Sequence, residues 1–371
     1  MAKKVLLIYI TAYSGHHRAS LAIEGALKKL SEEIEILNID FLEYFHPLSA
    51  KILNSLYFQV VKNMPQGWKY IYNNQKIYKR LLKSGKILGF LKSLKLKKLI
   101  YGFKPDVIVC TQAYPAWLLA EYKRRKNLDT PIIGVLTDYL PHLYWAHSHI
   151  NRYIVPSLPA KKILMEMGIQ ESKINNFGIP IDARFFQPID GNGVIEKIGL
   201  NKFLSIILIM GGGQGIGPIK NIIKIFNRFR FFPLQMIIVC GKNKKLERQI
   251  KQEFNISYHP LKVFGYAENI NELMKISSLI ITKAGGLTVS EALACHLPMI
   301  IVDPIPGQEA NNVQFLLKKG LILASKNGED AARLALGLLA DHRKLKRMRF
   351  KIKKFNKTDS AAAIASLILN Y

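Results

Sequence analysis

Apolar and polar positions alternate along the chain in a pattern that predicts short strands separated by helices. In the first half, mainly apolar segments that predict strands occur at 5–10, 34–39, 105–111, 131–137 and 151–156, and the first of them is apolar throughout. The second half repeats the pattern, with runs at 204–210, 235–240, 262–264, 279–282, 298–302 and 321–324. Continuously apolar strands are covered on both faces, and their alternation with amphipathic helices indicates a parallel α/β sheet in each half.

A break in this pattern suggests where one domain ends. Pro, Asp, Gly and Asn residues cluster at 187–193, which is typical of a linker. A chain of 371 residues is also too long for one ordinary core. We therefore predict an N-terminal domain at 1–187, a C-terminal domain at 188–355 and a last helix within 356–371.

The most informative stretch follows the predicted strand at 279–282. Gly285 and Gly286 come next, and a helix is expected to start at about Thr288. Adjacent glycines let the backbone approach a ligand, and the unpaired N–H groups at a helix start attract an anion. Glu291 lies three residues after Thr288, the spacing of a capping box. Glu291 therefore either caps its helix or binds a ligand.

A second polar loop follows the strand at 298–302 and carries Gln308, Glu309 and Asn312. Two polar loops at the carboxyl ends of neighbouring strands are typical of the ligand crevice of an open α/β sheet. We expect these side chains to line that crevice.

A glycine-rich loop begins the second half, directly after the strand at 204–210 and before a helix. A glycine also follows the next strand, and together the candidate positions are Gly211, Gly212, Gly213, Gly215, Gly217 and Gly241. A loop in this setting is a candidate phosphate cradle. It lacks the Lys-Ser/Thr ending of an ATP-binding loop, which excludes a nucleoside triphosphatase of that class.

Polar side chains also follow strands of the first half. His16 and His17 come after the first strand, and Asp138 follows the strand at 131–137. Each of them either takes part in chemistry at the crevice or caps a helix. His142, His147 and His149 lack the thiolate or carboxylate partners of a metal site, and no Asp-x-Asp motif occurs, so we expect no metal.

The net charge of +28 calls for an anionic partner, and its distribution suggests which one. Residues 44–105 contain thirteen Lys or Arg and no Asp or Glu, interleaved with aromatic and aliphatic side chains. Basic amphipathic helices with aromatic anchors suit an anionic lipid surface, and no nucleic-acid-binding module is recognisable. We predict a membrane-binding insertion whose docking lysines include Lys83, Lys86, Lys92 and Lys95.

Other features of the composition point to a protein inside the cell. The three cysteines are far apart in apolar runs, which favours buried thiols in a reducing compartment. The first residues lead directly into a strand, without room for a signal peptide, and no run approaches the roughly 20 apolar residues of a membrane span. We predict a cytoplasmic protein bound peripherally to the cytoplasmic face of the cell membrane.

The stretch 282–309 carries a family resemblance. Its Thr-Lys-x-Gly-Gly-x-Thr-x-x-Glu-Ala and Pro-x-Pro-Gly-Gln-Glu motifs resemble the donor site of the diacylglycerol glycosyltransferases. These include monogalactosyldiacylglycerol synthases and processive diacylglycerol glucosyltransferases, in glycosyltransferase family 28. The resemblance implies a GT-B fold, with two doubly wound Rossmann-like sheets facing a central cleft. It also implies a terminal helix that crosses back to the first domain.

The resemblance also implies roles for individual residues. His17 precedes Arg-Ala-Ser as in the family's catalytic motif and would be the base, although His16 replaces the usual glycine. Asp138 and Trp145 would lie on the acceptor side. For the donor, the resemblance implies that Glu291 holds the ribose, Gln308 and Glu309 the sugar, the backbone at Tyr266 and Ala267 the uracil, and the loop with Lys283 the diphosphate.

The resulting hypothesis is an inverting enzyme that transfers glucose or galactose from a UDP-sugar to diacylglycerol, with no cofactor and no nucleic-acid partner. The choice of hexose cannot be read, because the two differ at one hydroxyl. Two alternatives stay open: an N-acetylglucosamine transferase acting on a polyprenyl-linked acceptor, and a sugar-nucleotide epimerase of the same fold.

Overall fold

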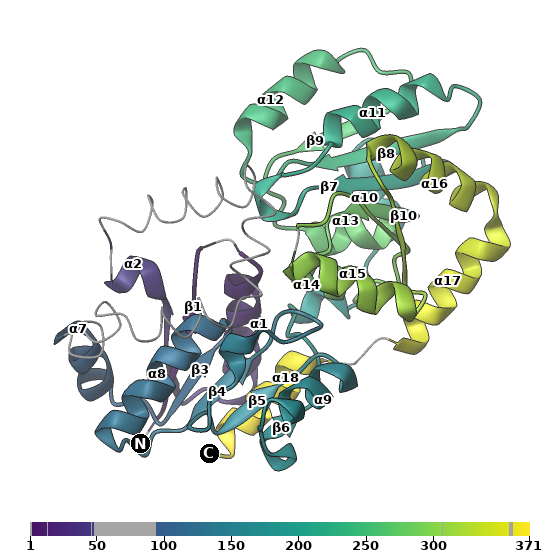
Figure 1. The fold of residues 1–371 in the computed structure, drawn as a ribbon. Helices are drawn as coiled ribbons and strands as arrows, with labels where there is room; N and C mark the ends of the chain where they lie inside the picture. The colour runs from purple at the N-terminus through teal and green to yellow at the C-terminus, as the bar shows by residue number, and fades with distance from the viewer. Residues whose placement is uncertain (1, 13, 46, 48–93, 306, 356–358) are drawn as a thin grey trace. The chain divides into compact units, whose positions relative to one another are not determined.

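The computed structural model describes residues 2–12, 14–45, 47, 94–305, 307–355 and 359–371. The chain forms two compact units, coloured from purple to blue-teal and from teal to yellow in Figure 1. Unit 1 comprises Met1–Ala183, Ile305–Asn311 and Asp359–Tyr371, and unit 2 comprises Arg184–Pro304 and Asn312–Thr358. The chain thus first passes from unit 1 to unit 2 after Ala183.

Unit 1 is built on a six-stranded parallel sheet with the order β2-β1-β3-β4-β5-β6. Because the chain moves from β1 outward to β2 and then back to β3 on the other side, the strand order reverses between β1 and β3. Ligands of open α/β sheets bind at such a switch point, outside the carboxyl ends of the strands. The strands are β1 (Lys3–Tyr9), β2 (Ile34–Asp40), β3 (Val107–Cys110), β4 (Ile132–Val135), β5 (Arg152–Ile154) and β6 (Ile174–Asn175).

Helices cover both faces of this sheet, and the alternation of side chains along β1 shows why its apolar run is continuous. Leu6 and Ile8 belong to the core on one face, and Val5 and Leu7 to the core on the other. The described helices of the unit are α1 (Gly15–Leu30), α2 (Phe41–Phe45), α7 (Leu94–Lys97), η1 (Lys98–Gly102), α8 (Ala113–Lys126), η2 (Leu143–Trp145), α9 (Leu158–Glu166), η3 (Glu171–Lys173) and α18 (Ser360–Leu369).

The terminal helix α18 completes the core of unit 1 although it lies at the far end of the chain. It packs against α1, and Ile364 and Ile368 join the same apolar cluster as Val5 and Leu7. Its first residue donates a hydrogen bond from Ser360 Oγ to the Ile179 carbonyl at 2.6 Å. In Figure 1 the yellow α18 accordingly lies among blue and teal elements of unit 1.

Unit 2 contains a second six-stranded parallel sheet, with the order β12-β11-β10-β7-β8-β9. Read from the other side, this is the Rossmann order, and its switch point lies between β7 and β10. The strands are β7 (Ser205–Met210), β8 (Leu234–Val239), β9 (Leu261–Phe264), β10 (Leu279–Thr282), β11 (Met299–Ile301) and β12 (Ile322–Ala324).

The helices of unit 2 follow its strands in regular succession, and two short 3-10 turns complete the set. They are η4 (Ala183–Phe185), α10 (Gly191–Lys197), η5 (Gly212–Gln214), α11 (Ile219–Arg228), α12 (Lys244–Glu253), α13 (Ile270–Ile276), α14 (Gly286–Ala294), α15 (Gln308–Lys318), α16 (Gly328–Ala340) and α17 (His342–Phe355). The start of α15, up to Asn311, belongs to unit 1. Two parallel sheets covered by helices confirm the predicted GT-B class of fold.

The structure reports little on the predicted membrane-binding insertion. Lys83, Lys86 and Lys92 lie outside the described residues, so their role stays a prediction. Lys95 is described, and its ammonium donates to the carbonyl of Tyr44 at 3.3 Å. No helix in the described ranges is both long and apolar enough to cross a membrane.

Candidate functional site

The predicted donor-binding loops of unit 2 gather at one edge of its sheet. The glycine-rich loop follows β7, Gly241 follows β8, Tyr266 and Ala267 follow β9, and Lys283 follows β10. All of these strands are parallel, so their carboxyl ends share an edge. The loops after β7 and β10 flank the switch point, the place where such sheets bind ligands.

Backbone packing explains several of the glycines without any ligand. A side chain on Gly215 would collide with the carbonyl of Cys240, and one on Gly241 with the carbonyl of Gly213. Both glycines have positive φ, 59° and 58°, which other residues rarely adopt. The Lys242 N–H also donates to Gly213 O at 2.9 Å. The glycine-rich loop is therefore fixed against the turn after β8 by main-chain contact.

Two glycines of the same loop have free space around them. Gly212 and Gly217 have φ of 66° and 133°, and an added Cβ would meet no atom within 4 Å at either position. Gly211 differs, because its Cβ would collide with the backbone of Ile216. The backbone at Gly212 and Gly217 is consequently open to the approach of a ligand.

Helix α14 begins at Gly286, two residues before the position at about Thr288 expected from the sequence. Its N-cap is Gly285, which has no side chain to accept from the first N–H groups. Thr288 lies inside the helix, so Thr288 and Glu291 do not form the capping box considered from the sequence. This helix start therefore presents backbone donors and the positive end of its dipole, which suits an anion.

Buried polar side chains lie next to the loop between β10 and α14. Glu291 is only 6% exposed, although a carboxylate is seldom buried so fully. Lys283 is also buried, at the end of β10. Asn312 is completely buried and donates from Nδ2 to the Ala284 carbonyl at 2.9 Å. The contact gives Asn312 a positioning role, because it fixes the backbone just ahead of Gly285.

Gln308 and Glu309 both have partners within the protein. Glu309 Oε2 accepts from the backbone N–H of Ile305 at 2.8 Å, closing the loop that precedes α15. Gln308 Nε2 donates to Asp138 Oδ2, and both residues belong to unit 1. The sequence pattern gave no sign of this hydrogen bond between predicted donor and acceptor residues.

The two histidines of unit 1 occupy the first turn of α1, at the switch point of the first sheet. Neither caps the helix, because the cap is Ser14, whose Oγ accepts from the His17 N–H at 3.2 Å. The His17 ring stacks on Tyr9, with centroids 4.2 Å apart. Both histidines thus lie just beyond the carboxyl end of β1.

The His16 ring is held by loops that follow two other strands. Its Nδ1 lies 2.9 Å from the Thr111 carbonyl and 2.8 Å from Thr137 Oγ1. Because a carbonyl only accepts, Nδ1 donates its proton to Thr111, which leaves the lone pair of the neutral ring on Nε2. Burial lowers the pKa of His16, and the opposing effect of Asp138 is smaller. At neutral pH His16 is therefore an uncharged imidazole beside a carboxylate.

The structure shows the surroundings of Asp138 and Trp145, and it excludes the helix-cap alternative for Asp138. A bend follows Asp138, and the next helical turn, η2, is capped by His142, so Asp138 is not a helix cap. Trp145 is 6% exposed and packs on Gly134 of β4, where an added Cβ would lie 3.0 Å from its ring. Trp145 is thus part of the core of unit 1, and its predicted place on the acceptor side stays a prediction.

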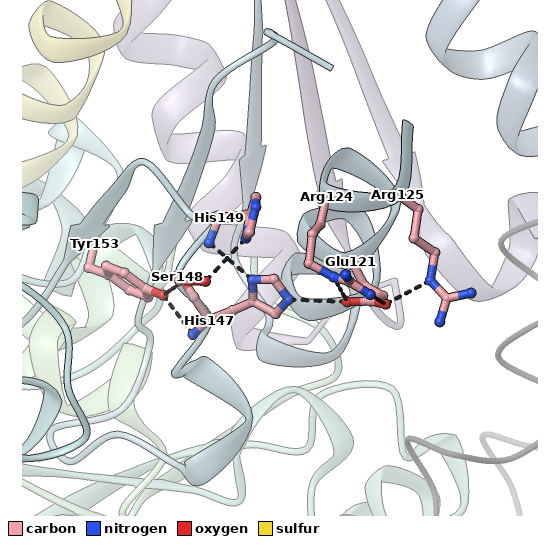
Figure 2. Close-up of polar contacts among 7 residues, drawn as sticks. All are labelled: Glu121, Arg124, Arg125, His147, Ser148, His149 and Tyr153. Atoms are coloured by element: carbon pink, nitrogen blue, oxygen red, sulfur yellow. Dashed lines mark hydrogen bonds and ion pairs between the residues drawn. The ribbon is translucent and has the colours of Figure 1, made fainter. Parts of the chain in front are cut away.

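A cluster that the sequence did not suggest fixes the loop after Asp138 to helix α8 (Figure 2). Glu121 Oε1 accepts hydrogen bonds from Arg124 at 2.6 Å and from Arg125 at 2.7 Å. The other carboxylate oxygen, Oε2, lies 3.6 Å from His147 Nε2. Hydrogen bonds from Arg124 and Arg125 lower the pKa of Glu121 to about 2, despite the opposing effect of burial. Glu121 therefore stays ionised in the folded protein and links helix and loop.

The rest of the cluster holds the loop against β5. Tyr153 is buried, and its hydroxyl donates to the His147 carbonyl at 2.7 Å while accepting from the His147 N–H at 3.1 Å. His147 Nδ1 accepts from the backbone of His149. Burial lowers the pKa of His147, outweighing the effect of Glu121. His147 and His149 thus help to fix the conformation of this loop, and His147 has the Glu121 carboxylate as a neighbour, which the sequence did not indicate.

Metal-binding clusters and reactive thiols are two other kinds of candidate site. No group of three or more His, Cys, Asp or Glu side chains among the described residues could hold a metal ion. The cysteines are free thiols, and burial raises the pKa of Cys240 to about 11 and that of Cys295 to about 12. Neither of these thiols is ionised at neutral pH, so neither is a ready nucleophile.

Comparison with protein families matches both units. Residues 16–181 match the model described as monogalactosyldiacylglycerol (MGDG) synthase. Residues 206–367 match the glycosyltransferase family 28 C-terminal domain. A curated relative from Bacillus cereus, named processive diacylglycerol beta-glucosyltransferase, is 30% identical over 100% of this chain and 94% of its own length.

Solved structures add evidence on the fold. MurG of Acinetobacter baumannii is similar with a TM-score of 0.62 and 14% identity, covering 100% of both chains. The co-structure of S. aureus MnaA with UDP is similar with a TM-score of 0.66 and 15% identity, covering 100% of this chain and 96% of that one. At these identities the likeness shows the architecture alone.

Proposed function

Because the chain belongs to the diacylglycerol glycosyltransferase family, we propose that it transfers a hexose from a UDP-sugar to diacylglycerol. The observation that carries the proposal is the arrangement of unit 2 at its switch point. There an open glycine-rich loop and the start of α14, which has no side-chain cap, both present backbone donors. This arrangement suits the diphosphate of a nucleotide sugar.

The donor is held by different groups along its length. The diphosphate contacts the backbone at Gly212, Gly217 and Gly286, whose fixed N–H groups stabilise the charge that develops as UDP leaves. The buried carboxylate of Glu291, one turn further along α14, accepts from the ribose hydroxyls. The backbone at Tyr266 and Ala267 contacts the uracil. The sequence lacks an Asp-x-Asp motif, so on this proposal no metal ion is required.

The reaction is a single displacement at the anomeric carbon. A base takes the proton of the acceptor hydroxyl, the acceptor oxygen forms a bond to the anomeric carbon, and the bond from that carbon to the UDP oxygen breaks. Starting from an α-linked UDP-sugar, inversion gives a β-glycoside. The relative from Bacillus cereus is named a beta-glucosyltransferase, which supports inversion and favours glucose as the sugar.

His17 is the proposed base, because it directly precedes Arg18-Ala19-Ser20, as the catalytic histidine does in the family's motif. His16 is the alternative, because its anchored ring beside Asp138 leaves Nε2 as a proton acceptor. A general base contributes about 10²- to 10⁴-fold to the rate. His17→Ala should lose that factor in transfer while UDP binds within a few-fold of the parent. If His16→Ala loses transfer and His17→Ala does not, the assignment is reversed.

The acceptor lies in a membrane, so the proposal includes peripheral attachment to an anionic bilayer. The basic insertion at 44–105 is one contact, through its interleaved cationic and aromatic side chains. Attachment of this kind is only partly sensitive to salt, because the apolar part is not screened. The insertion can be tested by vesicle binding of a variant with Lys83, Lys86, Lys92 and Lys95 replaced by Glu.

A further inference from the structure

Helix α17 has an unusual composition for a surface helix of unit 2. Its 14 residues include eight Lys or Arg and no Asp or Glu. In Figure 1 it lies along the outside of its unit, yellow-green, after α16. Surface helices commonly mix both signs of charge, so a helix with one sign alone needs an explanation.

One narrow stripe attaches α17 to the unit. Met348 and Ile352 are buried, and Leu345 and Phe355 are partly buried. The intervals of three, four and three residues put these four side chains on one face of the helix. The Phe355 ring lies 6.1 Å from that of Phe315 in α15, and the helix packs on α14 and α16. The face opposite this stripe is exposed.

The outward face has an aromatic side chain at its centre. Phe350 is 69% exposed, and at 100° per residue it lies opposite the buried stripe. Its neighbours three and four residues away on both sides are all cationic and all exposed: Lys346, Arg347, Lys353 and Lys354. A large apolar ring is therefore surrounded by four positive charges on a convex surface.

These charges are not neutralised within the described part of the chain. None of the ion pairs found there involves a side chain of α17, whereas Lys224 in α11 and Lys251 in α12 of the same unit each pair with a glutamate. Arg349, on the flank of the helix, donates to the Ser278 carbonyl at 3.1 Å. The cations around Phe350 thus remain available to an external anion.

We propose that the outward face of α17 docks on an anionic phospholipid bilayer, with Phe350 inserted at the level of the headgroups. Cations around an aromatic side chain match the two parts of such a surface, its phosphates and its apolar boundary. The choice of lipid over nucleic acid rests on the proposed function, since the acceptor is a membrane lipid. The docking surface itself is separate from the donor site and needs no bound substrate.

Two variants and two matched controls test the surface. The first variant replaces Lys346, Arg347, Lys353 and Lys354 with Gln, and its control makes the same change at Lys197, Lys244, Lys245 and Arg248 of unit 2, which are also exposed and in no ion pair found among the described residues. The second is Phe350→Ser, and its control is Phe231→Ser, which removes another fully exposed phenylalanine of the same unit. All of the replaced side chains are exposed, so melting temperatures should stay close to that of the parent.

Binding is measured by flotation with phosphatidylcholine vesicles that contain or lack phosphatidylglycerol. Each cation at the surface contributes about five-fold in binding, so the quadruple Gln variant should bind anionic vesicles at least about ten-fold more weakly than its control. Phe350→Ser should weaken vesicle binding by less than the quadruple variant does, and its loss of binding should remain at high salt because salt does not screen apolar insertion. Equal binding of the quadruple variant and its control overturns the proposal. So does a loss of RNA or DNA binding with vesicle binding intact.

A second assay separates this proposal from the proposed function. Transfer to diacylglycerol in nonionic detergent micelles needs no anionic surface, so the quadruple variant should match the parent there and fall behind on anionic vesicles. Failure of the parent to transfer in micelles contradicts the proposed function and leaves the vesicle result to decide the role of α17. If the quadruple variant loses transfer in micelles, α17 acts in catalysis as well, and its assignment as a docking surface alone is overturned.

Discussion

Gly285→Ala gives a direct test of the anion site at the start of α14. The residue has φ −64° and ψ 129°, which alanine adopts readily, and an added Cβ would meet no atom within 4 Å. Alanine at such a position lowers the entropy of the unfolded chain. The free energy of unfolding should therefore stay the same or rise by about 0.4–1 kcal/mol.

The expected effect on UDP binding is opposite in sign. The new methyl group would occupy space next to the first N–H groups of α14 and keep a phosphate oxygen from approaching them. A hydrogen bond to a charged group contributes about 1.5–3 kcal/mol. Losing one of them raises the Kd for UDP by roughly ten- to a hundred-fold.

Calorimetric titration with UDP and thermal melting of the same samples measure both effects. Gly337→Ala in α16 is the control, because a Cβ there also meets no atom within 4 Å and the position lies inside a helix. It should raise stability by about 1 kcal/mol and leave UDP affinity unchanged. If Gly285→Ala binds UDP as tightly as Gly337→Ala, the diphosphate does not lie at this helix start.

Two further predictions concern buried carboxylates. Glu291→Ala should weaken UDP itself by about 1–3 kcal/mol, whichever sugar is attached; titration with UDP that shows no change, beside a lower melting temperature, would leave Glu291 a purely structural role. Glu121→Gln should lower the free energy of unfolding at pH 7 by about 1–3 kcal/mol in urea titrations. Because the folded pKa of Glu121 is about 2 and its ordinary value 4.5, this stabilisation is complete above pH 4.5 and disappears as the pH falls toward 2. Parent and variant should therefore converge in acid, and a constant difference would contradict the role given to its charge.

The sheets could be predicted from the sequence because most of the strands are mainly apolar and alternate with helices. A strand covered on both faces, such as β1 with Leu6 and Leu7 in different cores, leaves a local pattern that needs no knowledge of distant contacts. The glycine-rich loops were found for the same reason, since turns and close backbone approach require glycine. Their meeting at one edge follows from the parallel order of the strands.

Other features depend on contacts between distant segments. The start of α14 was placed two residues late, because Gly285 can begin a helix as well as form part of a turn. The cluster around Glu121 joins α8 to the loop that carries His147, more than twenty residues further along the chain, and no local sequence pattern indicates this contact. Trp145 resembles a surface residue in its polar loop, yet it fills the space left by Gly134. The charges of α17 are visible in the sequence, but only the packing of Met348 and its neighbours shows which face is outward.

The central claim is tested most directly by following labelled sugar into lipid. The purified protein is incubated with diacylglycerol in detergent micelles and with UDP-glucose or UDP-galactose labelled in the hexose, and the lipids are separated by thin-layer chromatography. The account predicts a labelled glycolipid from UDP-glucose, in a form that a β-glucosidase cleaves. Label that stays in the aqueous phase with both donors, or a lipid product that resists β-glycosidases, would contradict it.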